Sequence, residues 1–303
     1  MGIGLLASLA AGALWALTFI TPVLLPDFGA AAITASRYLV YGLLSALLLV
    51  GRPWRALLAQ HWRGLLLMAW FGNLFCALLM VVAVQRTGAA LTALVLGCLP
   101  VTVPLSAVLF GHKLGRARLL RRLAPALLAI LGGLLLLQWP ALQRGLHPDL
   151  WGLAAAFGAL LSWNLYALIN ARYLAQHPDL PLRDWASLVG LGCLALLPSL
   201  ALLLPFEPAL PSAPQAWLWL LVCALLTGLG SAWGANWAWN LASSRLPMAL
   251  AGQLMVSETL FVLLFSFLYE GRGPNALEAA SILLVLGGVL WGVRALRPAQ
   301  PAQ

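Results

Sequence analysis

Residues 3–25 read IGLLASLAAGALWALTFITPVLL, an apolar run without a single charged residue. About 20 such residues span the roughly 30 Å of bilayer hydrocarbon as a helix. The run follows Met1 directly, without a basic segment before it, and it is longer than the apolar part of a signal peptide. We therefore expect a transmembrane helix that the mature protein retains.

Similar runs recur to the end of the chain, which has 303 residues, 63% of them hydrophobic and 8% charged. A soluble domain carries about 25% charged residues, so the composition predicts an all-α integral membrane protein. Successive prolines in 205–214 predict a loop, since proline cannot continue a helix. We expect ten transmembrane helices, at 3–25, 30–50, 64–84, 89–110, 123–139, 150–171, 185–204, 216–240, 247–269 and 276–293.

The basic residues between these runs predict the orientation. If the chain has ten helices, 13 Lys and Arg residues lie on the side of the termini and 4 lie on the other side (Arg37, Arg86, Arg144 and Arg272). Because loops rich in Lys and Arg stay in the cytoplasm, we expect both termini there. The net charge of +9 then reflects topology, and we expect no nucleic-acid partner. The 13 are Arg52, Arg55, Arg63, Lys113, Arg116, Arg118, Arg121, Arg122, Arg172, Arg183, Arg245, Arg294 and Arg297.

The chain also reads as two related halves, 1–145 and 146–303, with five predicted helices each. Trp15 has a counterpart in Trp163, and the motif LGG occurs at 131–133 and 286–288. Residues 109–112 (LFGH) are similar to 267–270 (FLYE). An odd number of helices per half reverses the second half in the membrane, which predicts an inverted repeat. Such repeats are typical of transporters that alternate access around a site near the midplane.

Several motifs resemble those of the drug/metabolite transporter superfamily, EamA type. Residues 99–101 (LPV) and 111–113 (GHK) match the end of that family's first repeat, and 258–259 (ET) with 269–271 (YEG) match the second. His112 replaces an acidic residue of the pattern and Thr259 replaces a proline. The resemblance covers nearly the whole chain, and it implies ten helices in two repeats with cytoplasmic termini.

Within that superfamily, two stretches resemble the aromatic amino-acid exporters (YddG-like). They are 162–166 (SWNLY), followed by Asn170 and Tyr173, and 238–240 (AWN). This resemblance implies export of amino acids or similar metabolites.

The chain has 14 tryptophans, a residue that favours the headgroup region of the membrane. Nine lie near segment ends, where we interpret them as an interfacial belt. Trp15, Trp163, Trp233 and Trp237 lie well inside the runs, where a belt does not explain them. The nine are Trp54, Trp62, Trp70, Trp139, Trp151, Trp185, Trp217, Trp219 and Trp291.

Helical spacing places these inner tryptophans beside polar residues, because residues three and four apart share a face. Such a face suits a cavity for an amphipathic solute, in which indoles contact an apolar group or a cation and amides pair with a carboxylate. Hydrogen bonding that only holds helices together is the alternative. The predicted substrate-binding residues are Trp15, Thr18, Asn73, Trp163, Tyr166, Asn170, Trp233, Asn236, Trp237, Asn240 and Gln253.

Glu258 is a carboxylate deep in an apolar run, where ionisable residues are costly and mark functional sites. Three roles are open for it: proton coupling, contact with a substrate ammonium group, or a structural hydrogen bond. Pro100 and Pro104 should kink their helix, either as a hinge or as a fixed bend. Gly132, Gly133, Gly287 and Gly288 are predicted helix-packing positions.

Other functions lack support in the residues. The four histidines (His61, His112, His147 and His177) are assigned to loops without a nucleophile beside them. The four cysteines lie in apolar runs without metal-ligand spacing, and no phosphate-binding loop occurs. We therefore expect no enzyme, no cofactor and no metal.

The resulting hypothesis is a secondary transporter in the bacterial inner membrane that exports aromatic or neutral amino acids, or a broader range of them, by alternating access. Predicted helices 1, 3, 4, 6, 8 and 9 would line its cavity. Its partners are small-molecule substrates and the lipid bilayer, with a monomer as the expected state. The alternatives are an exporter of drugs or other metabolites, and an intramembrane enzyme or lipid-handling protein. Phosphate-bearing cargo would need Lys or Arg in the cavity, and no such residue is assigned there. The sequence leaves open whether transport is facilitated or proton-coupled.

Overall fold

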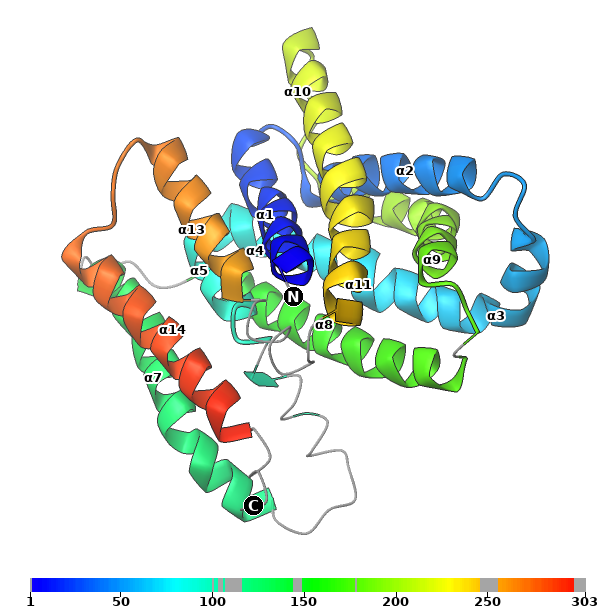
Figure 1. Cartoon of the computed structure of the whole chain (residues 1–303). Helices are drawn as coiled ribbons and strands as arrows, with labels where there is room; N and C mark the ends of the chain where they lie inside the picture. Colours follow the sequence, from blue (N-terminus) through cyan, green and yellow to red (C-terminus); the bar gives the residue numbers. More distant parts are fainter. Residues whose placement is uncertain are drawn as a thin grey trace, which may run out of the picture.

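The computed structural model describes residues 2–99, 101–102, 106, 116–143, 149–177, 179–245 and 256–296, and all regular structure within them is helical. The first half contains α1 (Gly2–Leu24), α2 (Ala30–Leu48), α3 (Trp54–Ala69), η1 (Trp70–Leu74), α4 (Phe75–Thr87), α5 (Ala89–Leu96) and α7 (Arg116–Gln143). The second contains α8 (Leu150–Gln176), α9 (Leu182–Leu196), η2 (Leu197–Phe206), α10 (Pro214–Leu225), η3 (Leu226–Gly234), α11 (Ala235–Arg245), α13 (Val256–Glu270) and α14 (Ala276–Leu296). Figure 1 shows them as one helical bundle.

The outer surface of this bundle is apolar. Leu6, Leu47 and Leu161 are each 68% exposed, and they belong to three different helices. Large apolar surfaces of this kind face lipid or a partner rather than water. Six helical stretches of the described chain are long and apolar enough to cross a bilayer, and two shorter apolar helices lie at Leu123–Leu136 and Ala276–Gly292. The prediction of an all-α membrane protein is confirmed, while the number of ten crossings stays a prediction.

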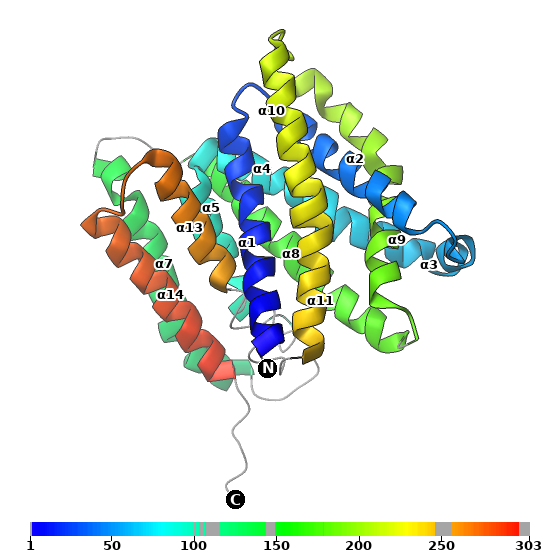
Figure 2. The ribbon, with the colours of Figure 1, turned by 45° about the horizontal axis from the view of Figure 1, so that its top comes forward.

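The start of α1 and the end of α14 lie at the same end of the bundle (Figure 2). This is the arrangement that an even number of crossings requires. The side of the membrane on which that end lies stays a prediction.

Two predicted segments differ from the observed helices. The helix predicted at 64–84 begins earlier, and α3, η1 and α4 continue without a break from Trp54 to Thr87. Only the last part of the segment predicted at 247–269 is described, as α13, and much of 89–110 lies outside the described residues, together with Pro100 and Pro104.

Two long helices are interrupted by π-helical segments at comparable places in the two halves. η1 divides α3 from α4, and η3 divides α10 from α11. A π segment leaves backbone groups out of the regular helical pattern, and such segments are frequent at functional sites. Side chains satisfy some of the carbonyls here: Ser162 donates to Phe71 at 2.7 Å and Thr227 to Cys223 at 2.7 Å.

The last helices of the two halves, α7 and α14, pack along each other (Figures 1 and 2). Gly133 and Gly288 lie in this interface, where an added Cβ would stand 2.9 Å from the Ser281 carbonyl oxygen and 2.8 Å from the Ala126 carbonyl oxygen. Gly132 and Gly287 have no atom within 4 Å of that position, so their prediction as packing residues is wrong.

Gly133→Leu should destabilise the protein, whereas Gly132→Leu should leave its stability nearly unchanged. The added side chain at 133 meets Val285 and the α14 backbone, and overpacking of this kind costs about 1–3 kcal/mol. Thermal unfolding of the two purified variants in detergent measures the difference. Equal melting temperatures would contradict this packing of α7 on α14.

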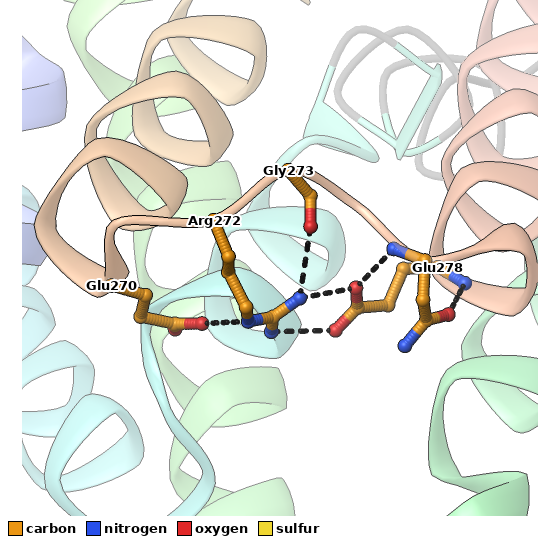
Figure 3. A network of polar contacts seen from close by, with 5 residues as sticks. Glu270, Arg272, Gly273 and Glu278 are labelled. Carbon is orange, nitrogen blue, oxygen red and sulfur yellow. Dashed lines mark hydrogen bonds and ion pairs between the residues drawn. The ribbon is translucent and has the colours of Figure 1, made fainter.

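Polar contacts fix the connection between α13 and α14 (Figure 3). The Arg272 guanidinium donates two hydrogen bonds to the Glu278 carboxylate, at 2.7 and 2.8 Å, and forms an ion pair with Glu270 at 2.6 Å. At the start of α14, the Asn275 backbone N–H donates to the Glu278 carboxylate at 2.8 Å, and the Glu278 backbone N–H donates to the Asn275 amide oxygen at 2.9 Å. The Glu278 carboxylate raises the pKa of Arg272.

Asp149 has a similar role at the start of α8. Its carboxylate accepts a hydrogen bond from the Gly152 backbone at 2.8 Å and another from Arg86 at 3.0 Å. The Gly152 N–H, as the largest cause, lowers the pKa of Asp149. The contact with Arg86 thus joins the start of α8 to the end of α4 at an exposed site.

Candidate functional site

A cavity lies between the helices of the two halves. Its empty volume is about 650 Å³, which includes space open to the surroundings. The side chains that line it come from α1, α2, α4, α5, α8, α11, α13 and the two π segments: Trp15, Thr18, Phe19, Arg37, Tyr38, Gly72, Asn73, Cys76, Ala77, Met80, Leu96, Leu99, Trp163, Tyr166, Ser231, Asn236 and Glu258.

Aromatic side chains form the apolar part of this lining. The rings of Trp163 and Tyr166 on α8 meet edge to face, with centroids 5.7 Å apart. Trp15 and Phe19 face the cavity from α1. The two tryptophans that sequence similarity pairs between the halves therefore lie at one cavity. Their indole faces can contact an apolar or cationic group of a solute.

The π segments and their surroundings supply neutral polar groups. Asn73 of η1 donates to the Met68 carbonyl at 3.0 Å, and Asn236, just after η3, donates to the Ala232 carbonyl at 2.6 Å. Ser231 donates to the carbonyl of Leu14 and thereby joins η3 to α1. Because each amide uses its N–H on the backbone, the amide oxygen remains as an acceptor for a solute.

Gly72 brings η1 close to α8. A Cβ at this position would lie 2.5 Å from Cγ of Tyr166, so the close approach depends on the missing side chain. Gly72 also lines the cavity. Its absence from the predicted site has a simple reason, since a glycine has no side chain for a sequence pattern to place on a face.

Arg37 also lines the cavity, which corrects the sequence-based interpretation. The sequence predicts it on the non-cytoplasmic side and predicts no basic residue inside a helix. The structure places it in α2, seven residues after Ala30, roughly 10 Å along the helix at 1.5 Å per residue. A charged residue inside the apolar run 30–50 was the signal that could have identified it.

Glu258 lies in the first turn of α13 and faces the same cavity. α1 packs closely on this turn, because a Cβ at Gly12 would lie 3.1 Å from the Glu258 backbone nitrogen. On the other flank, the hydroxyl of the buried Thr259 donates to the Ala93 carbonyl of α5 at 3.4 Å. The turn of α13 that carries this carboxylate is thus held at the cavity by contacts with two helices of the first half.

Other predicted site residues lie elsewhere. Asn170 accepts a hydrogen bond from the Trp185 indole at 3.0 Å and does not line the cavity. Trp233 and Trp237 stack on each other, with centroids 6.2 Å apart, and Trp237 is 50% exposed. The Asn240 side chain and Gln253 lie outside the described residues.

Asn170 belongs instead to a buried polar cluster that joins α3, α8 and α9. The His61 ring nitrogen and the Tyr173 hydroxyl are 2.6 Å apart, and Tyr173 stacks on Trp185. His61 and Trp185 are each 4% exposed, so the loop assignment of His61 and the interfacial assignment of Trp185 are wrong. Both side chains are covered because three helices converge on them.

The cavity lining offers groups that can bind a solute. The described residues contain no group of three His, Cys, Asp or Glu side chains that could hold a metal ion. The cavity combines aromatic faces, amide oxygens, one guanidinium and one carboxylate. These groups suit a solute with an apolar part and a charged or polar part.

Known proteins resemble the chain along almost its whole length. The model of the EamA-like transporter family matches residues 2–139 and 150–293. Inner membrane protein YtfF of Escherichia coli (strain K12) is 32% identical over 98% of this chain and 97% of its own length. A protein of solved crystal structure has the same fold, with a TM-score of 0.65 and 22% identity over 95% of this chain and 96% of its own.

Proposed function

Because the chain belongs to the EamA-like transporter family, we propose that it exports amino acids, aromatic and other neutral ones, by alternating access around the central cavity. The family membership and the relative YtfF make it a multi-pass transporter of the bacterial inner membrane. The observation that carries the choice of cargo is the lining of the cavity. Aromatic rings from α1 and α8 adjoin polar groups from five other elements, as an amphipathic solute requires.

Two features support alternating access: the family model matches two stretches of the chain, 2–139 and 150–293, and each half contains one π segment. Each half supplies one tryptophan and one π segment to the cavity or its border. In transporters built from repeats, a central site of this kind is exposed to one side and then the other as the halves move. The two halves, 1–145 and 146–303, are the moving units in this proposal.

A second cargo class is favoured by Arg37. Anionic or phosphate-bearing cargo needs a basic residue in the cavity, and Arg37 is such a residue. Arginine binds carboxylates and phosphates through paired hydrogen bonds. Organic anions and phosphorylated metabolites therefore belong in the same transport panel as the amino acids.

Trp163→Ala should reduce amino-acid flux into proteoliposomes by roughly tenfold, because it removes one aromatic wall worth about 1.4 kcal/mol. The experiment reconstitutes purified protein and measures uptake of a panel of labelled amino acids, organic anions and sugar phosphates. Trp237→Ala is the matched control, since Trp237 is exposed and does not line the cavity. If only the organic anions or sugar phosphates are transported, the cargo belongs to the second class and the amino-acid proposal is wrong.

A further inference from the structure

Two opposite charges face one cavity without pairing with each other. The guanidinium of Arg37 and the carboxylate of Glu258 both line the cavity, yet no ion pair joins them, since the ion pairs of the described residues involve other groups. Charged groups are costly inside a membrane protein unless they are paired. This arrangement therefore needs an explanation beyond packing.

Arg37 is oriented but has free donors. Its guanidinium lies 5.2 Å from the centre of the Tyr38 ring, a contact that stabilises a cation without using its N–H groups. Its Nε is buried and has no hydrogen-bond partner in the described part of the chain. The planar guanidinium has five donors in a fork that matches a carboxylate.

Glu258 has the complementary property. Its backbone is fixed by α1, and its half-buried carboxylate accepts no hydrogen bond from the residues that the structure describes. A carboxylate is an acceptor only and can hold an ammonium group. A structural role for this side chain would require a partner, and the described helices around it supply none.

We propose that Arg37 and Glu258 are the two poles of a zwitterion site, in which Arg37 binds the carboxylate of the cargo and Glu258 its ammonium group. This inference rests on the proposed function and specifies how the cavity recognises an α-amino acid. The rings of Trp15 and Trp163 then face the cargo side chain, which lets the site accept cargo of several sizes. Both charges of the cargo are neutralised by the protein, so the loaded cavity carries no additional net charge.

The proposal predicts which analogues compete for transport. The experiment measures uptake of labelled L-phenylalanine into proteoliposomes in the presence of phenethylamine, which lacks the carboxylate, or 3-phenylpropionate, which lacks the ammonium group. A second series uses L-leucine, isoamylamine and 4-methylpentanoate. In the wild type, each analogue should compete at least about tenfold more weakly than the amino acid, since each leaves one buried charge unpaired.

Variants should lose this discrimination selectively. Arg37→Gln should reduce amino-acid uptake by about tenfold or more, and phenethylamine should then compete about as well as phenylalanine. Glu258→Gln should also reduce amino-acid uptake, and 3-phenylpropionate should then compete about as well as phenylalanine. Arg37→Lys keeps the charge but not the fork, so it should be intermediate. Because competition is a ratio within one variant, a reduced amount of folded protein does not mimic the result.

The outcomes separate this inference from the proposed function. Amino-acid flux with unchanged discrimination in Arg37→Gln and Glu258→Gln overturns the zwitterion site and leaves the exporter standing. Flux in Glu258→Gln that keeps its analogue selectivity but no longer responds to an imposed pH gradient assigns Glu258 to proton coupling and also overturns it. A wild type that moves no amino acid overturns both.

Discussion

Gly72→Leu should reduce transport by about a hundredfold while the protein still folds. Gly72 lines the cavity, and even a Cβ there would lie 2.5 Å from Cγ of Tyr166. Overpacking costs about 1–3 kcal/mol, and each 1.4 kcal/mol is about a tenfold change. The branched side chain would also occupy space between η1 and α8 that the cargo needs. Uptake of labelled amino acids into proteoliposomes measures the effect.

Two further variants make this result specific. Gly72→Ala should be intermediate, because Tyr166 must move but the cavity keeps most of its volume. Gly132→Leu adds the same side chain where no atom lies within 4 Å of the new Cβ, on a helix that does not line the cavity. It should transport at the wild-type rate. Normal transport by Gly72→Leu, with a single folded species in gel filtration, would show that the cargo does not pass between η1 and α8.

The sequence predicted much of the cavity because local spacing and internal similarity carry that information. Trp15, Thr18 and Asn73 line it, together with Trp163, Tyr166, Asn236 and Glu258. These residues lie on helices whose apolar runs make the polar and aromatic exceptions conspicuous. They meet at one cavity because the two halves pack against each other. Five predicted helices in each half already predict an inverted repeat, and such a repeat has its site between the halves.

Some predicted site residues do not line the cavity, and the reasons are physical. Trp233 and Trp237 share a face, as their spacing predicts, since their rings stack, but this face does not line the cavity. The π segment η3 lies across this stretch, and a π segment changes which side of the helix its residues present. Asn170 follows Tyr166 by one turn, yet its partner is Trp185, which α9 brings from a distant part of the chain. The spacing of residues along one helix cannot predict a tertiary contact of this kind.

Arg37 shows a different limit. A count of basic residues by side treated it as a loop charge, although it lies inside an apolar run. Placing it in the cavity leaves 13 basic residues on one side and 3 on the other, which is 4 less Arg37. The predicted charge asymmetry is then stronger, and the cavity has a cation of its own.

The orientation can be tested by an all-or-none experiment. Gly273→Cys should react with a membrane-impermeant maleimide in spheroplasts, whereas Arg52→Cys should react only after the membrane is permeabilised. Gly273 and Arg52 are both exposed in connections between helices, and seven predicted crossings separate them. Because seven is odd, they must lie on opposite sides, and the excess of basic residues places Arg52 in the cytoplasm.

The native cysteines give a low background for this labelling, since Cys76, Cys98, Cys193 and Cys223 are all buried. Asp179→Cys and Ser212→Cys flank α9 and test the second half by itself, with Ser212→Cys expected to react in spheroplasts. Reaction of Gly273→Cys and Arg52→Cys on the same side would mean an even number of crossings between them. The two halves would then share one orientation, and a site between inverted repeats would no longer follow. Labelling of the two cysteines on opposite sides would establish an odd number of crossings between them. The two halves are then inverted relative to each other, as they must be to open the cavity alternately to either side.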